Sequence, residues 1–349
     1  MGLVQHYPAL NRPAAPVCSV CIANYNGVAL LADCLESVLS QLGSPSIEII
    51  VHDDASTDDS VALLRKKYPQ IELLASTENV GFCISNNRMA AHARGEYILL
   101  LNNDAALYPD GLSTLLEAAC APARSGILTL PQYDWTTDTL VDRGCLLDPF
   151  YNPVPNRDPQ RTDVAMAIGA CLFMARELWC ELGGFPEWFE SIGEDLYICC
   201  LARLRGVSVQ VTSCSGYRHR QGASFGGNRV VSNQLQTTFR RRRLSERNKT
   251  IAMVICTPTF IVWWLLALHL AALVAEGVTM AMIRLDRKIW NEIYSPAIYF
   301  ACAAPITLSK RRQGVQKDRR ATLLSYLCAF VLLPQKLKLL LLHGVPKIH

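Results

Sequence analysis

The stretch Tyr97-Ile-Leu-Leu-Leu-Asn-Asn-Asp104 is a run of mostly apolar residues that ends abruptly in two amides and a carboxylate. Such a run without a helical period predicts a strand that is buried on both faces of a parallel sheet. Ligands of open α/β sheets bind at the carboxyl ends of the strands, where Asn102, Asn103 and Asp104 fall. Asp104 could instead cap the next helix. However, Pro109 and Asp110 start that helix too far along the chain for this.

The hundred residues that contain this stretch alternate between predicted strands and predicted helices. Strands are predicted at residues 17–23, 47–51, 71–75 and 97–101. Helices are predicted at residues 30–42, from the loop at 52–58 up to residue 67, and at 83–94. This alternation is typical of βαβ units, so we expect an α/β, Rossmann-like and mostly parallel sheet flanked by helices. Neither GxGxxG nor GxxxxGK[ST] follows the first strand, so a nucleotide would be held in another way.

Charge is distributed unevenly along the 349 residues. Residues 1–239 carry 16 lysines and arginines against 25 aspartates and glutamates, whereas residues 240–349 carry 18 against 5. A basic and apolar second part suits an anionic membrane surface better than nucleic acid, because nucleic-acid-binding arms do not need a long apolar run such as residues 251–275. We therefore expect membrane lipid as a partner, and no nucleic acid.

The cysteines indicate a reducing compartment. The chain has 14 of them, and the polar, proline-containing residues 1–15 lack the apolar core of a signal peptide, so we expect reduced, cytosolic thiols. Cys18 and Cys21 form a CxxC pair, but no second such pair exists, and on a strand these two side chains point to opposite faces. A zinc site is therefore not expected there.

Four motifs at successive strand ends carry a family resemblance. They are Cys21-Ile-Ala-Asn-Tyr-Asn-Gly27, Val51-His-Asp-Asp-Ala-Ser-Thr-Asp58, Asn79-Val-Gly-Phe82 with Asn86-Asn87, and Leu100-Leu-Asn-Asn-Asp104. In this order they resemble the family 2 glycosyltransferases of GT-A fold, and most of all the bacterial rhamnosyltransferase-like branch. Four later motifs follow the family's order up to about residue 225: Gly169-Ala-Cys-Leu-Phe-Met-Ala-Arg176, Gly183-Gly-Phe185, Glu194-Asp195 and His219-Arg-Gln-Gly-Ala-Ser224.

The resemblance implies roles for individual residues. A divalent metal, Mg²⁺ or Mn²⁺, would be held by Asp104 and His219, and an imidazole ligand favours Mn²⁺. Asp195 would be the general base of an inverting transfer, with Glu194 and Arg220 near the acceptor or behind the reacting groups. The nucleotide would be bound by Asn24, Tyr25, Asp53, Asn79, Asn87 and Asn103. Asp53 could instead be a helix cap, but Ser56, Thr57 and Asp58 lie closer to the helix, which would free Asp53 for a ligand.

The implied function is transfer of a sugar from a nucleotide-diphosphate sugar to a lipid-linked saccharide in surface polysaccharide or glycolipid synthesis. Pro186, Tyr197 and Leu201 depart from the family's pattern, which bears on the sugar or the acceptor. One alternative is a sugar-phosphate nucleotidyltransferase, although such enzymes usually carry a glycine-rich basic loop where this chain has Asn24-Tyr-Asn-Gly27. The other is a catalytically inactive, membrane-bound sensor of sugar nucleotides.

The predicted organisation is a tail at residues 1–16, a GT-A domain at 17–239 and a membrane-associating helical region at 240–349. Residues 251–275 are long and apolar enough to cross a bilayer. Residues 293–308 could return across it, or the helices could lie in the membrane interface with basic flanks on anionic lipid. Both arrangements predict a location on the cytoplasmic face of a bacterial inner membrane, where a polyprenyl-linked oligosaccharide would be the acceptor.

Overall fold

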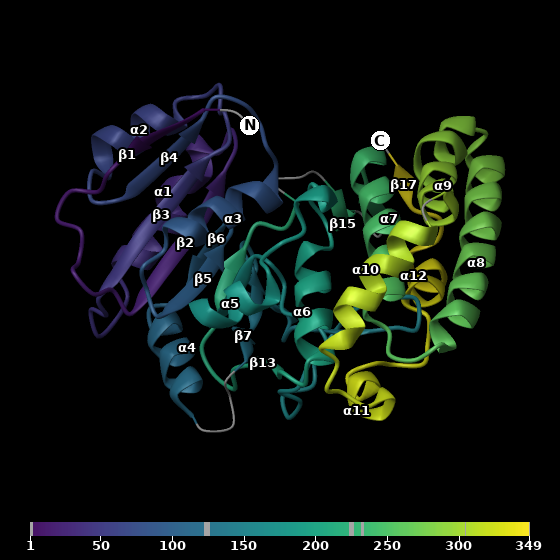
Figure 1. Cartoon of the computed structure of the whole chain (residues 1–349). Helices are drawn as coiled ribbons and strands as arrows, with labels where there is room; N and C mark the ends of the chain where they lie inside the picture. The colour runs from purple at the N-terminus through teal and green to yellow at the C-terminus, as the bar shows by residue number, and fades with distance from the viewer. Residues whose placement is uncertain (1–2, 122–125, 223–226, 232–233, 304, 349) are drawn as a thin grey trace.

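The computed structural model describes residues 3–121, 126–222, 227–231, 234–303 and 305–348. Its centre is an eight-stranded sheet with helices on both faces (Figure 1). In spatial order the strands are β1 (Val4–Tyr7), β4 (Glu72–Ser76), β3 (Ile47–Asp53), β2 (Cys18–Asn24), β5 (Tyr97–Leu101), β12 (Cys171–Ala175), β7 (Ile127–Thr129) and β13 (Val209–Val211). Strands β4, β3, β2 and β5 are mutually parallel, which confirms the predicted sheet.

Strand β5 is buried on both faces, as its apolar run predicts. Ile98 and Leu100 belong to the core on one face of the sheet, and Leu99 and Leu101 belong to the core on the other. Helix α3 (Phe82–His92) covers the first face, while α1 (Val28–Leu39) and α4 (Gly111–Cys120) cover the second. Helix α2 (Ser60–Lys67) follows β3. Strand β1 pairs antiparallel with β4, so the segment predicted as a tail contributes an edge strand.

A smaller sheet lies beside the carboxyl end of β5. Its order is β6 (Ala105–Leu107), β14 (Tyr217–His219), β8 (Gln132–Asp134) and β9 (Leu140–Asp142). Strand β14 is antiparallel to β6 and parallel to β8, with His219 opposite Ala105 and Tyr217 opposite Gln132. This register brings residues 219 and 104 together although they are far apart in sequence.

The remaining elements complete the domain around these two sheets. They are the hairpin β10 (Cys145–Leu147) and β11 (Pro153–Pro155), helix α5 (Arg176–Leu182), a 3₁₀ turn (Glu187–Phe189), helix α6 (Glu194–Leu204), and a third sheet of β15 (Gly227–Val231), β16 (Gln234–Thr237) and β17 (Lys347–Ile348). Cys18 and Cys21 lie in different cores on opposite faces of β2, as predicted.

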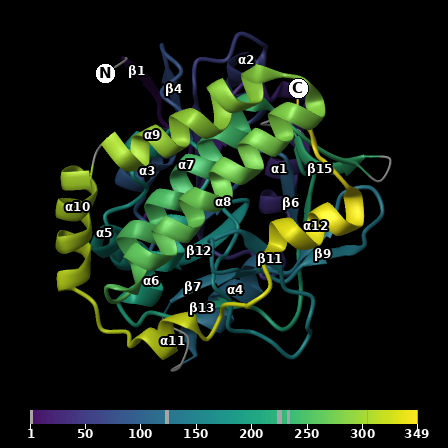
Figure 2. The same ribbon diagram turned by 90° about the vertical axis from the view of Figure 1, so that its right-hand side faces the viewer.

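The chain after residue 239 is helical. It forms α7 (Phe239–Cys256), α8 (Ile261–Arg284), a π-helix (Ile289–Tyr294), α9 (Ser295–Ala303), α10 (Pro305–Lys317), α11 (Leu323–Leu327) and α12 (Gln335–His343) (Figure 2). Helix α7 packs on α6, and its last residues, 251–256, are fully buried in the main core. The region after residue 239 therefore begins inside the fold of the preceding domain.

The structure corrects the prediction of one apolar segment over residues 251–275. Helix α7 ends at Cys256, Thr257 is extended because Pro258 follows it, and α8 starts only at Ile261. Among the described residues, α8 is the helix that is long and apolar enough to cross a membrane. Within its most apolar 18 residues, 22% are buried. The expected return segment at 293–308 is divided among the π-helix, α9 and α10.

Candidate active site

A chain of hydrogen bonds joins the carboxyl ends of β5, β2 and β3. Asn103 Nδ2 donates to Asn24 Oδ1 at 2.8 Å, and Asn24 Nδ2 donates to Asp53 Oδ2 at 2.8 Å. All three side chains are buried. The orientation of both amides follows from the carboxylate, which can only accept at neutral pH. The structure therefore brings together three of the residues that the motifs assigned to nucleotide binding.

Asp53 does not cap α2, but it has hydrogen-bond partners within its own loop. Its Oδ1 accepts from the backbone N–H of Ser56 at 2.9 Å, and its Oδ2 accepts from the Ser56 hydroxyl at 2.7 Å. Asp58 instead binds the backbone N–H groups of Val28 and Ser60, at 2.9 and 3.0 Å. Asp53 thus fixes its own loop through two hydrogen bonds from Ser56.

The neighbouring loop is held by Asp54, which the motifs did not single out. Its carboxylate accepts from the backbone N–H groups of Val80 and Gly81 at 2.7 and 2.9 Å. This contact fixes the loop that carries Asn79. Asn79 and Tyr25 are both exposed at the rim of the strand ends.

Asn87 has a structural contact that its predicted nucleotide role did not anticipate. Its amide N–H donates to the carbonyl of Phe185 at 2.9 Å, and its amide oxygen accepts from the Phe185 backbone N–H at 2.9 Å. Both ends of the carboxamide therefore bind the backbone of one residue, Phe185, which ties α3 to the loop after α5. We leave Asn87 out of the proposed nucleotide site for this reason.

Asp104 and His219 meet as the resemblance implied. His219 Nε2 lies 3.1 Å from Asp104 Oδ1, and both side chains are buried. His219 Nδ1 lies 3.0 Å from Gln132 Oε1, and the same oxygen accepts from the Tyr217 hydroxyl at 2.8 Å. This network assigns the proton of a neutral imidazole to Nδ1, so its Nε2 lone pair faces a carboxylate oxygen. A proton on Nε2 or a metal ion between the two atoms would satisfy both electron pairs.

Gln132 is the residue of this centre that the sequence did not reveal. Its amide N–H donates to Asp142 Oδ2 at 3.2 Å, which fixes the amide oxygen toward His219. Burial raises the pKa of Asp142 to about 7. Gln132 belongs to no motif and lies on a three-residue strand, and only the pairing of β8 with β14 places it beside His219.

The acidic pair at the start of α6 is linked to the end of β5 through the backbone of residues 169–170. Asp195 Oδ2 accepts from the backbone N–H of Gly169 at 2.9 Å. The carbonyl of the following residue, Ala170, accepts a hydrogen bond from the backbone N–H of Asn102 at 3.1 Å. The carboxylate of Asp195 is thereby connected to the Asn102-Asn103-Asp104 motif through one short stretch of backbone.

Glu194 and Asp195 are both buried. Burial raises the pKa of Asp195, and burial together with the charge of Asp195 raises the pKa of Glu194 to about 8. Arg241 on α7 opposes both shifts. Asp195 accepts two backbone N–H groups, whereas Glu194 Oε2 accepts no hydrogen bond from the described part of the chain. The negative charge of the pair at neutral pH is therefore best placed on Asp195.

The loop before this pair is strained and is held from α7. Glu190 and Ile192 have φ values of 66° and 68°, which non-glycine residues rarely adopt and which cost about 1–3 kcal/mol each. Asn248 Nδ2 lies within hydrogen-bonding distance of the carbonyls of Phe189, Ser191 and Ile192, at 3.0, 3.1 and 2.7 Å. Helix α7 therefore fixes the position of the acidic pair.

Arg220 is engaged within the protein. Its guanidinium donates to Asp33 at 2.6 Å and lies 3.8 Å from the ring centroid of Trp135, and its backbone N–H donates to the Asp104 carbonyl at 2.9 Å. The side chain is thus held by Asp33 and Trp135, and the backbone of Arg220 is held by Asp104. Residues 223–224 of the same motif lie outside the described residues.

Comparisons with known proteins agree with this architecture. Residues 19–181 match the sequence model of glycosyl transferase family 2. The chain is 30% identical over 189 residues to chondroitin synthase of Escherichia coli. This match covers 52% of this chain and 26% of that protein. It is 24% identical over 205 residues to an N-acetylglucosaminyl-diphospho-decaprenol L-rhamnosyltransferase of Mycobacterium tuberculosis. This match covers 50% of this chain and 67% of that protein.

The solved structures include mannosyltransferase PcManGT of Pyrobaculum calidifontis in complex with GDP-Man and Mn²⁺. It has a TM-score of 0.51 and 18% identity, and the match covers 92% of this chain and 88% of that one. The chain spans a third or less of the length of the first curated relatives that it matches. The matched residues support a family 2 glycosyltransferase, and the architecture of the chain is a GT-A fold.

Proposed function

We propose that the protein is a metal-dependent, inverting glycosyltransferase that uses a nucleotide-diphosphate sugar. The observation that carries this proposal is the meeting of three groups at one edge of the sheet. The Asn24–Asp53–Asn103 chain and the Asp104–His219 pair are joined at the consecutive residues Asn103 and Asp104, and the Asp195 carboxylate comes from a separate part of the sequence. They supply contacts for a nucleotide, ligands for a cation and a base.

The donor would lie along the carboxyl ends of β3, β2 and β5. Asn24 and Asp53 form the floor of the nucleotide site, with Tyr25 and Asn79 exposed at its rim. Asp104 and His219 fit a divalent cation, because they present a carboxylate oxygen and an imidazole nitrogen 3.1 Å apart. Such a cation would neutralise the charge that develops on the departing diphosphate.

Asp195 would take the proton from the acceptor hydroxyl as that oxygen attacks the anomeric carbon. Its raised pKa makes it a stronger base than an ordinary aspartate, while two backbone N–H groups keep it ionised and oriented. Glu194 would stay protonated beside it. Attack on the face opposite the leaving diphosphate inverts the anomeric centre.

The acceptor that we propose is a lipid-linked saccharide at a membrane surface. The rhamnosyltransferase relative is named for a decaprenol-linked substrate. Helix α8 suits such a surface, because Trp264, Leu268 and Met282 are exposed, whereas Glu276 turns inward to the basic side chains of Arg242 and Lys336. The protein would lie on the cytoplasmic face of the membrane, either peripherally or with one short hairpin of spans.

The test is donor turnover by the Asp195→Asn variant. Membrane-associated protein is incubated with Mn²⁺ or Mg²⁺, a panel of nucleotide sugars and a lipid extract, and release of nucleoside diphosphate is followed. We expect turnover to fall by a factor of about 1,000 or more in Asp195→Asn, with nucleotide binding retained. The exposed Asp158→Asn is the matched control and should behave like the wild type.

Three results would contradict the proposal. Transfer by Asp195→Asn at a rate near that of the wild type would remove Asp195 as the base. Release of pyrophosphate from a nucleoside triphosphate and a sugar phosphate would identify a nucleotidyltransferase instead. A wild-type protein that binds nucleotide sugar but never releases nucleoside diphosphate would be a sensor.

A further inference from the structure

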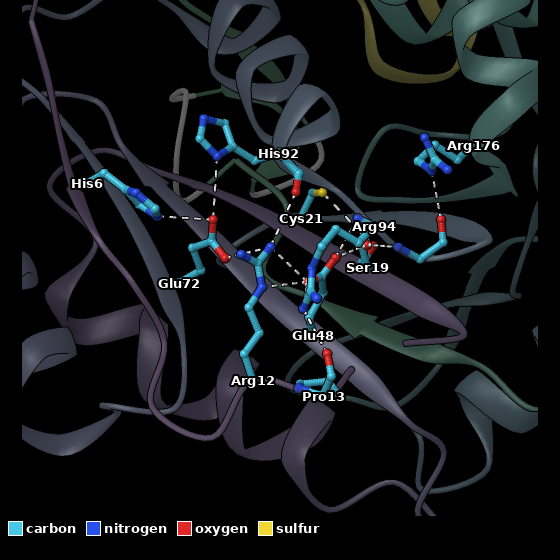
Figure 3. A network of polar contacts seen from close by, with 11 residues as sticks. His6, Arg12, Pro13, Ser19, Cys21, Glu48, Glu72, His92, Arg94 and Arg176 are labelled. Atoms are coloured by element: carbon cyan, nitrogen blue, oxygen red, sulfur yellow. Dashed lines mark hydrogen bonds and ion pairs between the residues drawn. The ribbon is translucent and has the colours of Figure 1, made fainter. Parts of the chain in front are cut away.

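A second cluster of possible metal ligands lies at the opposite edge of the sheet. It consists of His6 on β1, Glu72 at the start of β4 and His92 at the end of α3 (Figure 3). Glu72 is at the amino end of its strand, whereas Asp53 is at the carboxyl end of the parallel neighbour β3. The cluster is therefore separate from the proposed catalytic centre.

The three ligand atoms have spacings that suit a small transition-metal ion. Glu72 Oε1 lies 3.1 Å from His6 Nε2 and 3.5 Å from His92 Nδ1, and all three atoms lie within 4.8 Å of one another. Zinc binds such ligands at about 2.0–2.2 Å in tetrahedral geometry, which places neighbouring ligand atoms about 3.4 Å apart. Small side-chain movements would complete this geometry.

The carboxylate of the cluster is held in the manner of a metal ligand. Glu72 is 1% exposed, and its other oxygen, Oε2, pairs with Arg12 at 2.7 Å. Arg12 also pairs with Glu48 at 3.0 Å, and Glu48 in turn pairs with Arg94, so the charge of Arg12 is shared (Figure 3). A ligating carboxylate is commonly fixed by such a second contact. Oε1 is left facing the two imidazoles.

The histidines are accessible from solvent. Their side chains are 41% exposed for His6 and 45% exposed for His92. Both belong to regular elements, since His6 pairs with Leu74 across the β1–β4 ladder and His92 ends α3. An ion can therefore enter from solvent between the two imidazole rings and reach the buried carboxylate of Glu72. Water could bind the ion on the side that faces solvent.

We propose that His6, Glu72 and His92 form a second metal site that takes a borderline divalent ion such as Zn²⁺. Two imidazoles and one carboxylate favour Zn²⁺ or Co²⁺ over Mg²⁺, which prefers oxygen ligands. The ion would join the edge strand β1 to α3 and β4, and so stabilise the start of the chain on the sheet. The site would bind whether or not the proposed transferase activity is correct.

The test uses full-length protein without a histidine tag, stripped with EDTA and carrying His219→Ala to remove the other imidazole ligand. Titration with Zn²⁺ by calorimetry, and with Co²⁺ by its visible absorption, should give one equivalent and a tetrahedral spectrum. His6→Ala and His92→Ala should each weaken binding at least tenfold and abolish the zinc-dependent rise in melting temperature. His343→Ala on α12 is the control and should bind as the parent does.

Folding of the variants is checked by melting in EDTA, where they should match the parent because both histidines are exposed. Zinc binding that survives in His6→Ala or His92→Ala would overturn the proposal. An equal loss in His343→Ala would also overturn it. So would a drop in melting temperature that is the same in EDTA as in zinc, since the histidines would then act only as hydrogen-bond partners of Glu72.

Discussion

Replacing Gln132 with leucine removes the acceptor that orients the ring of His219. The hydrogen bond from His219 Nδ1 to Gln132 Oε1 is 3.0 Å long, and loss of such an outer contact typically weakens metal binding by about 10–100-fold, or about 1.4–2.8 kcal/mol. The same change leaves the buried hydroxyl of Tyr217 without its acceptor, at a cost in stability of about 1–3 kcal/mol. Gln132→Leu should therefore lose both metal affinity and thermal stability.

The double variant Gln132→Leu/Tyr217→Phe separates the two effects. It removes the stranded hydroxyl, so most of the stability should return while metal binding stays weak. Affinity is measured from the electron paramagnetic resonance signal of free Mn²⁺ in the presence of a nucleoside diphosphate. Tyr217→Phe alone should bind Mn²⁺ like the wild type. If Gln132→Leu binds Mn²⁺ with unchanged affinity, Gln132 does not orient a metal ligand and the reasoning fails.

Three further predictions concern other parts of the molecule. Asp104→Ala should reduce turnover more than Asn102→Ala, because only Asp104 offers a carboxylate, and the reverse order in steady-state assays would contradict the metal assignment. Glu194 is protonated in the folded protein up to about pH 8 but ionises near 4.5 when unfolded, so its contribution to stability is lost as pH rises through this range. The free energy of unfolding, measured in urea, should fall less steeply between pH 5 and 8 in Glu194→Gln than in the wild type. Parallel plots of this free energy against pH for the two proteins would refute the prediction. Gly277→Ala should lower the melting temperature, since an added Cβ would lie 2.7 Å from the ring of Tyr294, and an unchanged value would show that α8 can shift at no cost.

The polar ends of the strands could be predicted because they depend on local sequence. An apolar run that stops at Asn102 marks a buried strand and its carboxyl end, and the parallel order then forces Asn24, Asp53 and Asn103 to one edge. Contacts that depend on register between distant segments could not be read in this way. Gln132 reaches His219 only through the pairing of β8 with β14.

Hydropathy also misplaced the start of the apolar helix. The summed hydropathy of residues 251–275 counts apolar side chains, but it does not distinguish those that face a protein core from those that face outward. Residues 251–256 fill the interior against α6, and Pro258 separates them from α8. Asn87 illustrates the same limit for polar residues, because a backbone segment 98 positions away binds its amide.

The buried end of α7 has a practical consequence for how the protein can be divided and where it can act. A chain cut at residue 239 would lose Asn248 and the apolar residues 251–256, so a soluble catalytic fragment would have to extend at least through Cys256. The apolar helices are thus not a flexible tether. If α8 rests on a membrane, as we propose, the packing of α7 on α6 and α8 would hold Asp195 at a fixed height above that surface, and this height would limit the length of acceptor that can reach the proposed base.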